Sequence, residues 1–239
     1  MTDQRDRLCV ALDGSDRDWI VATARELGPE VGWLKLGLEA FTAHGPALVA
    51  EIAAGPSKVF LDLKLHDIPT TVRRAASNCA ASGTAMFNVH AAGGRGMLEA
   101  AVDGARAGAG SSAVLVLAVT LLTSIDRTGL AELGFDGEPE QLVLRWARLA
   151  QEAGLDGVVA SPREAASIRR ECGPVFLIVT PGVRPVWAVA NDQLRVTTPA
   201  AAAAAGSDIL VVGRPITGAP RPREAARRIL DEIAGTGRD

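Results

Sequence analysis

The chain has 239 residues, of which 48% are hydrophobic and 22% charged, a balance typical of globular proteins and not of disordered ones. The formal net charge is -3 and aromatic residues make up 4%, so we expect no nucleic-acid partner. Three scattered cysteines argue against a disulfide framework and a zinc site, and the longest apolar stretch, Ala113 to Leu122, is too short to span a membrane. The charged N-terminus lacks a signal-peptide pattern, and we expect a cytoplasmic protein with no membrane partner.

Short strand-like runs alternate with helical stretches along the chain. The expected strands are Leu8–Leu12, Val31–Leu36, Lys58–Leu63, Ala85–Val89, Ala113–Val119, Gly157–Val159, Val175–Val179 and Ile209–Val212. The expected helices are Asp18–Leu27, Gly45–Ala54, Thr70–Ser82, Gly94–Ala107, Glu138–Ala153, Pro162–Cys172, Thr198–Ala205 and Arg223–Ala234. This alternation predicts a parallel sheet, and its length fits one α/β domain over residues 1–239, a (β/α)8 TIM barrel. An open, doubly wound sheet stays the alternative, because the pattern does not show closure.

Charged residues interrupt strands that a parallel sheet would otherwise make wholly apolar. In the third strand Asp62 and Lys64 alternate with leucines, in the second strand Lys35 lies between two leucines, and Asp13 follows the first strand. Because side chains alternate across a strand, we expect these charges inside the barrel near its carboxyl-terminal mouth, where barrel enzymes have their active sites. An ion-pair network that only fixes the sheet is the other interpretation.

A lysine held between carboxylates keeps its proton, because opposite charges favour the charged form. Such a lysine is a poor nucleophile for Schiff-base formation. It is a good proton donor and a good electrostatic stabiliser for a carbanion. The cluster therefore favours chemistry in which negative charge develops on a carbon atom.

Two loops carry signals for a phosphorylated ligand. Barrel enzymes often bind phosphate after strands seven and eight, near a short helix. Gly213 and Arg214 follow the last expected strand, and Arg184 follows the seventh, although Arg184 is equally well explained as a solvated loop cation. The spacing of histidines and cysteines indicates no metal site, and we expect His90 to be structural rather than catalytic.

The segment Asp62–Val72 resembles the signature Asp-x-Lys-x-x-Asp-Ile-Pro-x-Thr-Val of the orotidine 5′-phosphate decarboxylase family, in its short bacterial form. Supporting segments occur in the family's order over nearly the whole chain. They are Val10–Asp13, Lys35–Gly37, Asn88–Ala91, Val119–Ser124, Thr180–Arg184, Asp192–Gln193 and Val212–Pro215. Leu36 and Leu194 depart from the family's common residues, but neither has a proposed catalytic role.

The resemblance implies a homodimeric (β/α)8 barrel. It implies conversion of orotidine 5′-phosphate to uridine 5′-phosphate and carbon dioxide in pyrimidine (UMP) biosynthesis, without a metal or other cofactor. The family's charged array matches Lys35, Asp62, Lys64 and Asp67, with Lys64 as the proton donor to C6 and Asp62 beside the departing carboxylate. Asp67 and Thr71 would reach across the dimer interface into the partner's site.

The resemblance also implies the substrate contacts. Asp13 and Lys35 would hold the ribose hydroxyls together with Asp67 from the partner, and Thr123 would contact the pyrimidine. Distant phosphate contacts can contribute binding energy that orients the reacting ring. The residues implied for the phosphate are Arg184, Gln193, Gly213 and Arg214.

Two other functions stay open. Sugar-phosphate decarboxylases and aldolases of the same superfamily share the Asp-x-Lys-x-x-Asp element but use magnesium, carry an acidic ligand where Lys35 stands, and lack the Asp-Gln phosphate loop. A non-catalytic nucleotide-binding barrel is the second alternative. The intact pair of Asp62 and Lys64 argues against it.

Overall fold

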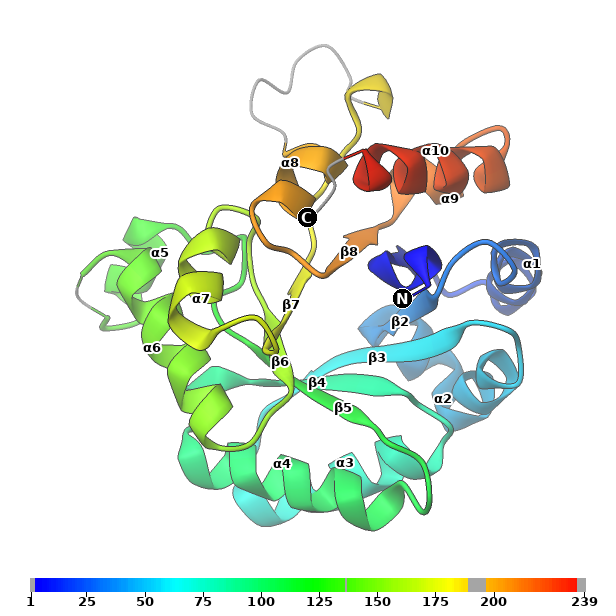
Figure 1. Cartoon of the computed structure of the whole chain (residues 1–239). Coiled ribbons are helices and arrows are strands. Elements are labelled where there is room, and N and C mark those ends of the chain that lie inside the picture. The colour runs from blue at the N-terminus through cyan, green and yellow to red at the C-terminus, as the bar shows by residue number, and fades with distance from the viewer. Residues whose placement is uncertain (1–2, 136, 189–196, 236–239) are drawn as a thin grey trace.

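The computed structural model describes residues 3–135, 137–188 and 197–235. Its strands pair in parallel and in chain order, and the last strand pairs with the first, so that the sheet is a closed barrel (Figure 1). The strands are β1 (Leu8–Ala11), β2 (Trp33–Gly37), β3 (Lys58–Leu65), β4 (Met86–His90), β5 (Leu115–Val119), β6 (Gly157–Val159), β7 (Leu177–Thr180) and β8 (Ile209–Val212). This closure confirms the predicted (β/α)8 barrel and rules out the open sheet.

Helices surround the barrel (Figure 1). They are α1 (Arg17–Leu27), α2 (Leu38–Ala53), α3 (Pro69–Ala81), α4 (Arg95–Gly108), α5 (Arg127–Glu132), α6 (Pro139–Glu152), α7 (Ala165–Cys172), α8 (Pro199–Ala204), α9 (Arg214–Thr217) and α10 (Pro222–Ala234), with the 3₁₀ turns η1 (Gln4–Arg7), η2 (Ala91–Gly93) and η3 (Val186–Ala188). The short helices α5 and α9 were not predicted. The prediction for α2 was wrong at its start. The helix begins at Leu38, kinks at Gly45 with φ 63°, and continues from Pro46, whose ring indicates a helix start.

Alternate strand residues build two apolar layers. Leu61, Leu63 and Leu65 pack in the layer between the barrel and its helices, as the alternation predicts. A smaller cluster fills the barrel itself, and its buried members are Cys9, Ala11, Trp33, Phe60, Met86, Leu117, Val179, Ile209 and Val211. The inward-facing residues nearer the carboxyl-terminal ends of the strands therefore lie above this apolar cluster.

Helix α3 is fixed by close packing against α4, which lies beside it in Figure 1. A Cβ at Gly104 or Gly108 of α4 would overlap a carbonyl oxygen of α3, so only glycine permits this approach. Pro69 occupies the first turn of α3, a position that suits its fixed φ. The packing thus fixes α3, which carries Thr71 and begins two residues after Asp67.

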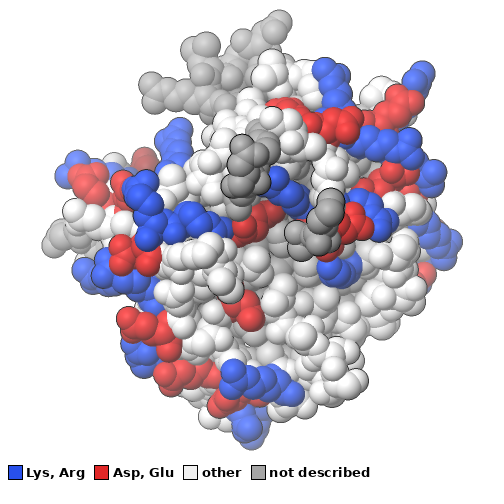
Figure 2. All heavy atoms as spheres, viewed as in Figure 1, with Lys and Arg blue, Asp and Glu red and all other residues white. Residues whose placement is uncertain are grey.

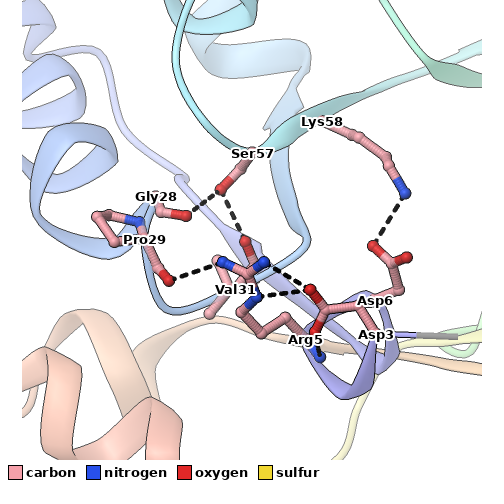
Figure 3. Close-up of polar contacts among 8 residues, drawn as sticks. All are labelled: Asp3, Arg5, Asp6, Gly28, Pro29, Val31, Ser57 and Lys58. Atoms are coloured by element: carbon pink, nitrogen blue, oxygen red, sulfur yellow. Dashed lines mark hydrogen bonds and ion pairs between the residues drawn. The ribbon is translucent and has the colours of Figure 1, made fainter. Parts of the chain in front are cut away.

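Polar contacts join separate segments of the chain at the amino-terminal end of the barrel (Figure 3). Lys58, at the start of β3, pairs with Asp6 at 2.9 Å. The buried Ser57 hydroxyl lies 2.9 Å from the carbonyl oxygen of Gly28 and 2.8 Å from that of Val31. These contacts stabilise this end of the barrel, which we call the base.

The surface carries charges of both signs. In the view of Figure 2, basic and acidic side chains lie interspersed along the upper right, the left and the bottom, and the centre and lower right are mainly uncharged. Of the helices in the described part of the chain, none combines the length and the apolar character that a membrane crossing requires.

Candidate active site

Four charged side chains meet at the carboxyl-terminal ends of the first three strands. The Lys35 ammonium lies 2.9 Å from Asp13 Oδ1 and 3.3 Å from Asp62 Oδ2. The Lys64 ammonium lies 2.6 Å from the other oxygen, Asp62 Oδ1. Neighbouring parallel strands end at the same edge of a barrel, which is why residues far apart in sequence converge here. The predicted convergence at the mouth is confirmed for these four side chains.

The buried members of the cluster stabilise each other's charges. The side chains of Lys35 and Asp62 are 10% and 14% exposed. Burial alone would lower the pKa of the Lys35 ammonium, but Asp62 and Asp13 outweigh it and the pKa is raised. Burial alone would raise the pKa of the Asp62 carboxyl, but the ammonium groups of Lys35 and Lys64 outweigh it and the pKa is lowered. Lys35 and Asp62 are therefore both charged at neutral pH.

A buried amide on β4 completes the cluster. The Asn88 side chain is fully buried. Its Nδ2 donates to Asp62 Oδ1 at 2.7 Å, and its Oδ1 accepts the backbone N–H of Lys64 at 2.7 Å. Asn88 lies in the segment Asn88–Ala91 that resembles the family, but the resemblance implies no role for it. The available signal was an amide in an otherwise apolar stretch of strand.

Lys64 enters the cluster from an irregular backbone. The side chain lies on the same side of β3 as Asp62, as the alternation predicts, but the backbone φ of Lys64 is 53°. The pairing of β3 with β4 shifts register between Leu61 and Leu65. A bulge of this kind re-aims a side chain, and here the Lys64 ammonium points back to Asp62.

A cavity of about 220 Å³ opens beside the cluster. Lys35, Asp62 and Lys64 line one part of it, and Thr123 lines another, as expected for a residue of the loop after β5. Apolar residues from several strands and loops form the remaining wall, namely Phe60, Val119, Leu121, Leu122, Val159, Ala160, Pro181 and Val211. An apolar wall with charges at one end suits a flat ring whose reacting edge faces those charges.

A wider groove of about 650 Å³ continues from this cavity. It lies between the loops that follow β5, β6 and β7, and it shares Leu121, Leu122, Thr123 and Pro181 with the cavity. Gly182 also lines the groove. A ligand larger than one ring therefore has room beyond the cavity.

Three of the four residues predicted to bind phosphate stand on neighbouring loops of the same mouth. Gly213 lies beside Asp13, and a Cβ built on Gly213 would stand 4.0 Å from Asp13 Oδ2. Arg214 is exposed as the first residue of α9. Arg184 is half-buried in the loop after β7. Gln193 lies outside the described residues.

Asp67 and Thr71 do not join the cavity of their own chain. Both residues are exposed, and the Asp67 carboxylate accepts the backbone N–H of Ile68 at 2.6 Å. Ile68 itself is 67% exposed. In the described part of the chain, the predicted charged array is therefore assembled without Asp67.

Two histidines stand at the ends of β3 and β4. The rings of His66 and His90 have centroids 5.4 Å apart. Burial lowers the pKa of His90, and the charges of His66 and Lys64 lower it further. Among the residues that the structure describes, no three His, Cys, Asp or Glu side chains are grouped as a metal site requires.

Residues 6–229 match the sequence model of the Orotidine 5'-phosphate decarboxylase / HUMPS family. The chain belongs to this family. The resemblance seen in the sequence is thereby confirmed, and the match covers every strand of the barrel.

Individual relatives within the family are similar over almost their full length. Orotidine 5'-phosphate decarboxylase of Heliobacterium modesticaldum is 52% identical, with 96% of each chain covered. The protein of the same name from Anaeromyxobacter sp. (strain K) is 53% identical, over 94% of this chain and 96% of the relative. The crystal structure of orotidine 5'-phosphate decarboxylase from Lactobacillus acidophilus superposes with a TM-score of 0.85 at 37% identity, covering 95% of this chain and 99% of the other.

Proposed function

We propose that this protein converts orotidine 5′-phosphate to uridine 5′-phosphate and carbon dioxide, a step of pyrimidine biosynthesis. The observation that carries the proposal is the Asp62 carboxylate held between the ammonium groups of Lys35 and Lys64 at the charged end of a cavity with an apolar wall. About half of all residues are identical to those of relatives named for this activity, over nearly the whole chain.

The reaction breaks the bond between C6 of the pyrimidine and its carboxylate carbon. The electron pair stays on C6, and carbon dioxide leaves. The pyrimidine carbonyls do not readily delocalise this pair, so the site acts through fixed charges and a proton. Lys64 stabilises the developing negative charge and donates the proton from Nζ to C6. Water then returns a proton to the Lys64 amine.

Asp62 supports this chemistry from beside the departing carboxylate. Its Oδ1 holds the Lys64 ammonium at 2.6 Å, which fixes the direction from which the proton arrives. Its Oδ2 faces Lys35 at 3.3 Å. Both lysines are therefore positioned before the substrate binds, and little reorganisation accompanies the reaction.

The remaining residues bind the parts of the substrate that do not react. Asp13 and Lys35 hold the ribose hydroxyls, and Thr123 contacts the pyrimidine. The phosphate is held by Arg184, Gln193, Arg214 and the backbone of Gly213. Gly213 lies close to Asp13. This closeness supports the assignment of the two residues to phosphate and ribose, because ribose and phosphate are adjacent in the substrate.

The active unit is a homodimer in which Asp67 and Thr71 of one protomer enter the site of its partner. The exposure of both residues, and of Ile68 between them, supports an interface here.

We place the protein in the cytoplasm as a single domain. The free thiols of its three cysteines agree with a reducing compartment.

The reaction needs no metal ion. This part of the proposal rests on Lys35, whose ammonium already stands between the carboxylates of Asp13 and Asp62. A divalent cation at that point would meet a positive charge at short range. Magnesium-dependent turnover of a sugar phosphate is the outcome that would favour the other branch of the family.

The test is the change in ultraviolet absorbance of orotidine 5′-phosphate on mixing with purified protein in excess chelator. We expect rapid conversion to uridine 5′-phosphate, and none with Lys64→Ala, whose circular dichroism and thermal midpoint serve as controls for folding. Near-normal activity of Lys64→Ala contradicts the proton-donor role. No conversion by the folded wild-type protein contradicts the proposed function.

A further inference from the structure

The bulge in β3 places three residues opposite one residue of β4. Leu61 pairs with Phe87 and Leu65 pairs with Val89, so the stretch Asp62-Leu63-Lys64 stands opposite Asn88 alone. The backbone N–H of Lys64 is bonded to the Asn88 side chain, at 2.7 Å. An amide side chain here supplies the acceptor that a carbonyl of the neighbouring strand supplies in a regular ladder.

Lys64 holds a backbone conformation that residues with a side chain seldom adopt. Within the described part of the chain, it is the one non-glycine residue with a positive φ, at 53°. Such a conformation persists where the surroundings hold it in place, and it is frequent at active sites. The hydrogen bond from Lys64 N–H to Asn88 Oδ1 acts directly on this backbone.

The other end of the same amide fixes the Asp62 carboxylate. Asn88 Nδ2 donates to Asp62 Oδ1 at 2.7 Å, and this oxygen also accepts the Lys64 ammonium at 2.6 Å. Asp62 Oδ2 is thereby left to face Lys35. The amide has one orientation only, because a flipped Asn88 would turn its NH2 group toward the Lys64 N–H, and two donors would face each other.

We propose that Asn88 is a positioning residue of the active site, whose single buried amide sets the backbone of Lys64 and the carboxylate of Asp62 in the relative geometry that proton transfer needs. The inference rests on the proposed function for its kinetic test. Asn88 acts through Lys64 and Asp62, and it needs no contact of its own with the substrate.

The variants Asn88→Ala and Asn88→Asp separate the two hydrogen bonds. Alanine removes both of them. Aspartate keeps an acceptor for the Lys64 N–H but directs a second carboxylate at Asp62. Val89→Ala is the matched control, because Val89 is a fully buried neighbour on β4 that packs in the apolar layer between the barrel and its helices. It is expected to lose stability and to keep its kcat per folded molecule.

We expect Asn88→Ala to lower kcat by about 100-fold, since a misplaced reacting group can cost that much, and to change KM by less than about threefold. Asn88→Asp is also expected to lower kcat, because like charges then face each other at Asp62. A kcat for Asn88→Ala equal to that of Val89→Ala overturns the proposal. An inactive wild-type protein instead overturns the proposed function.

The pH profile gives a readout that a merely structural residue would not move. The hydrogen bond from Asn88 helps to keep the pKa of the Asp62 carboxyl low, so the acid limb of kcat is expected at higher pH in Asn88→Ala than in wild type. An unshifted limb counts against the proposal. The ionisable groups around Asp62 are the same in both proteins, namely Cys9, Asp13, Lys35, Lys64 and His90.

Amide hydrogen exchange at Lys64 tests the positioning without reference to activity. We expect the Lys64 N–H to be protected in wild type and in Asn88→Asp, and to exchange faster in Asn88→Ala. Equal protection in wild type and Asn88→Ala overturns the inference even if the enzyme is active. Loss of protection only in Asn88→Ala supports it even if the substrate proves to be a different one.

Discussion

Asp13 and Gly213 lie side by side although they stand at opposite ends of the chain, and a Cβ on Gly213 would stand 4.0 Å from Asp13 Oδ2. The pairing of β8 with β1 brings them together. Closure of the barrel therefore places the proposed ribose contact beside the proposed phosphate contact. Arg214, the proposed phosphate cation, is the next residue along and begins α9.

Arg214→Ala is expected to weaken substrate binding and to leave the chemistry of the bound substrate largely intact. A charge-assisted hydrogen bond is worth roughly 1.5–3 kcal/mol, so KM should rise about 10- to 100-fold. The measurement is the initial rate against the concentration of orotidine 5′-phosphate. Arg221→Ala is the control, because Arg221 is an exposed cation that pairs with Glu224 outside the site. An unchanged KM for Arg214→Ala would remove Arg214 from the phosphate site.

Mixing two inactive variants tests whether Asp67 serves the site of its own chain or the site of its partner. Asp67→Ala and Lys64→Ala should each be nearly inactive as homodimers. If Asp67 enters the partner's site, a hybrid dimer has one site with both defects and one intact site, and a mixture should recover about a quarter of wild-type activity. The measurement is activity after the two proteins are unfolded and refolded together.

The alternative arrangement predicts a different result for the same mixture. If Asp67 served its own chain, each site of a hybrid would carry one defect, and activity would not return. A mixture of Lys64→Ala with Asp62→Asn is the control, because those residues share one site and one chain. Every site in that mixture carries one of the two defects, so we expect no recovery of activity.

His90 is expected to stay neutral at pH 7. Burial, with the nearby charges of His66 and Lys64, keeps its pKa below the ordinary value of about 6.5. As the pH falls, His90 therefore takes up a proton in the unfolded chain before it does so in the folded protein. The free energy of unfolding falls from about pH 6.5 down to the pKa of His90 in the folded protein. The measurement is the ring titration of His90 by NMR.

The same titration checks which groups cause the shift. In Lys64→Ala one positive charge near His90 is removed, so its titration midpoint should move to higher pH. Lys58→Ala is the matched control, since Lys58 lies at the base of the barrel and pairs there with Asp6. A midpoint that does not respond to Lys64→Ala would leave burial and His66 as the causes.

The sequence predicts the barrel and the position of most of the site for reasons that are local. Strands such as Leu8–Ala11 and Ile209–Val212 are short apolar runs between turns, and they are recognised by composition alone. Lys35 and Asp62 are predicted to point inward because strand alternation has a fixed period of two. Their convergence then follows from the rule that active sites of barrels lie at the carboxyl-terminal mouth.

The remaining features depend on contacts between distant segments. The role of Asn88 follows from a register shift between β3 and β4, and no local pattern encodes that shift. The positive φ of Lys64 is likewise unexpected for a lysine and is held by tertiary contacts. The first part of α2 was missed because Gly45 and Pro46 give a stronger helix-start signal than Leu38 does.

A substitution at the base of the barrel should lower the stability of the protein without changing its activity. The Ser57 hydroxyl lies between the carbonyl oxygens of Gly28 and Val31 (Figure 3). Ser57 precedes β3, at the opposite end of that strand from the charged mouth. Ser57→Ala leaves these buried carbonyls with one fewer donor, which should lower the free energy of unfolding by about 1–2 kcal/mol. The measurement is urea denaturation beside the kcat of the folded enzyme, which should be unchanged. A loss of kcat in Ser57→Ala would mean that the base transmits its geometry to the mouth, and the base would then belong to the machinery that positions Lys35 and Lys64.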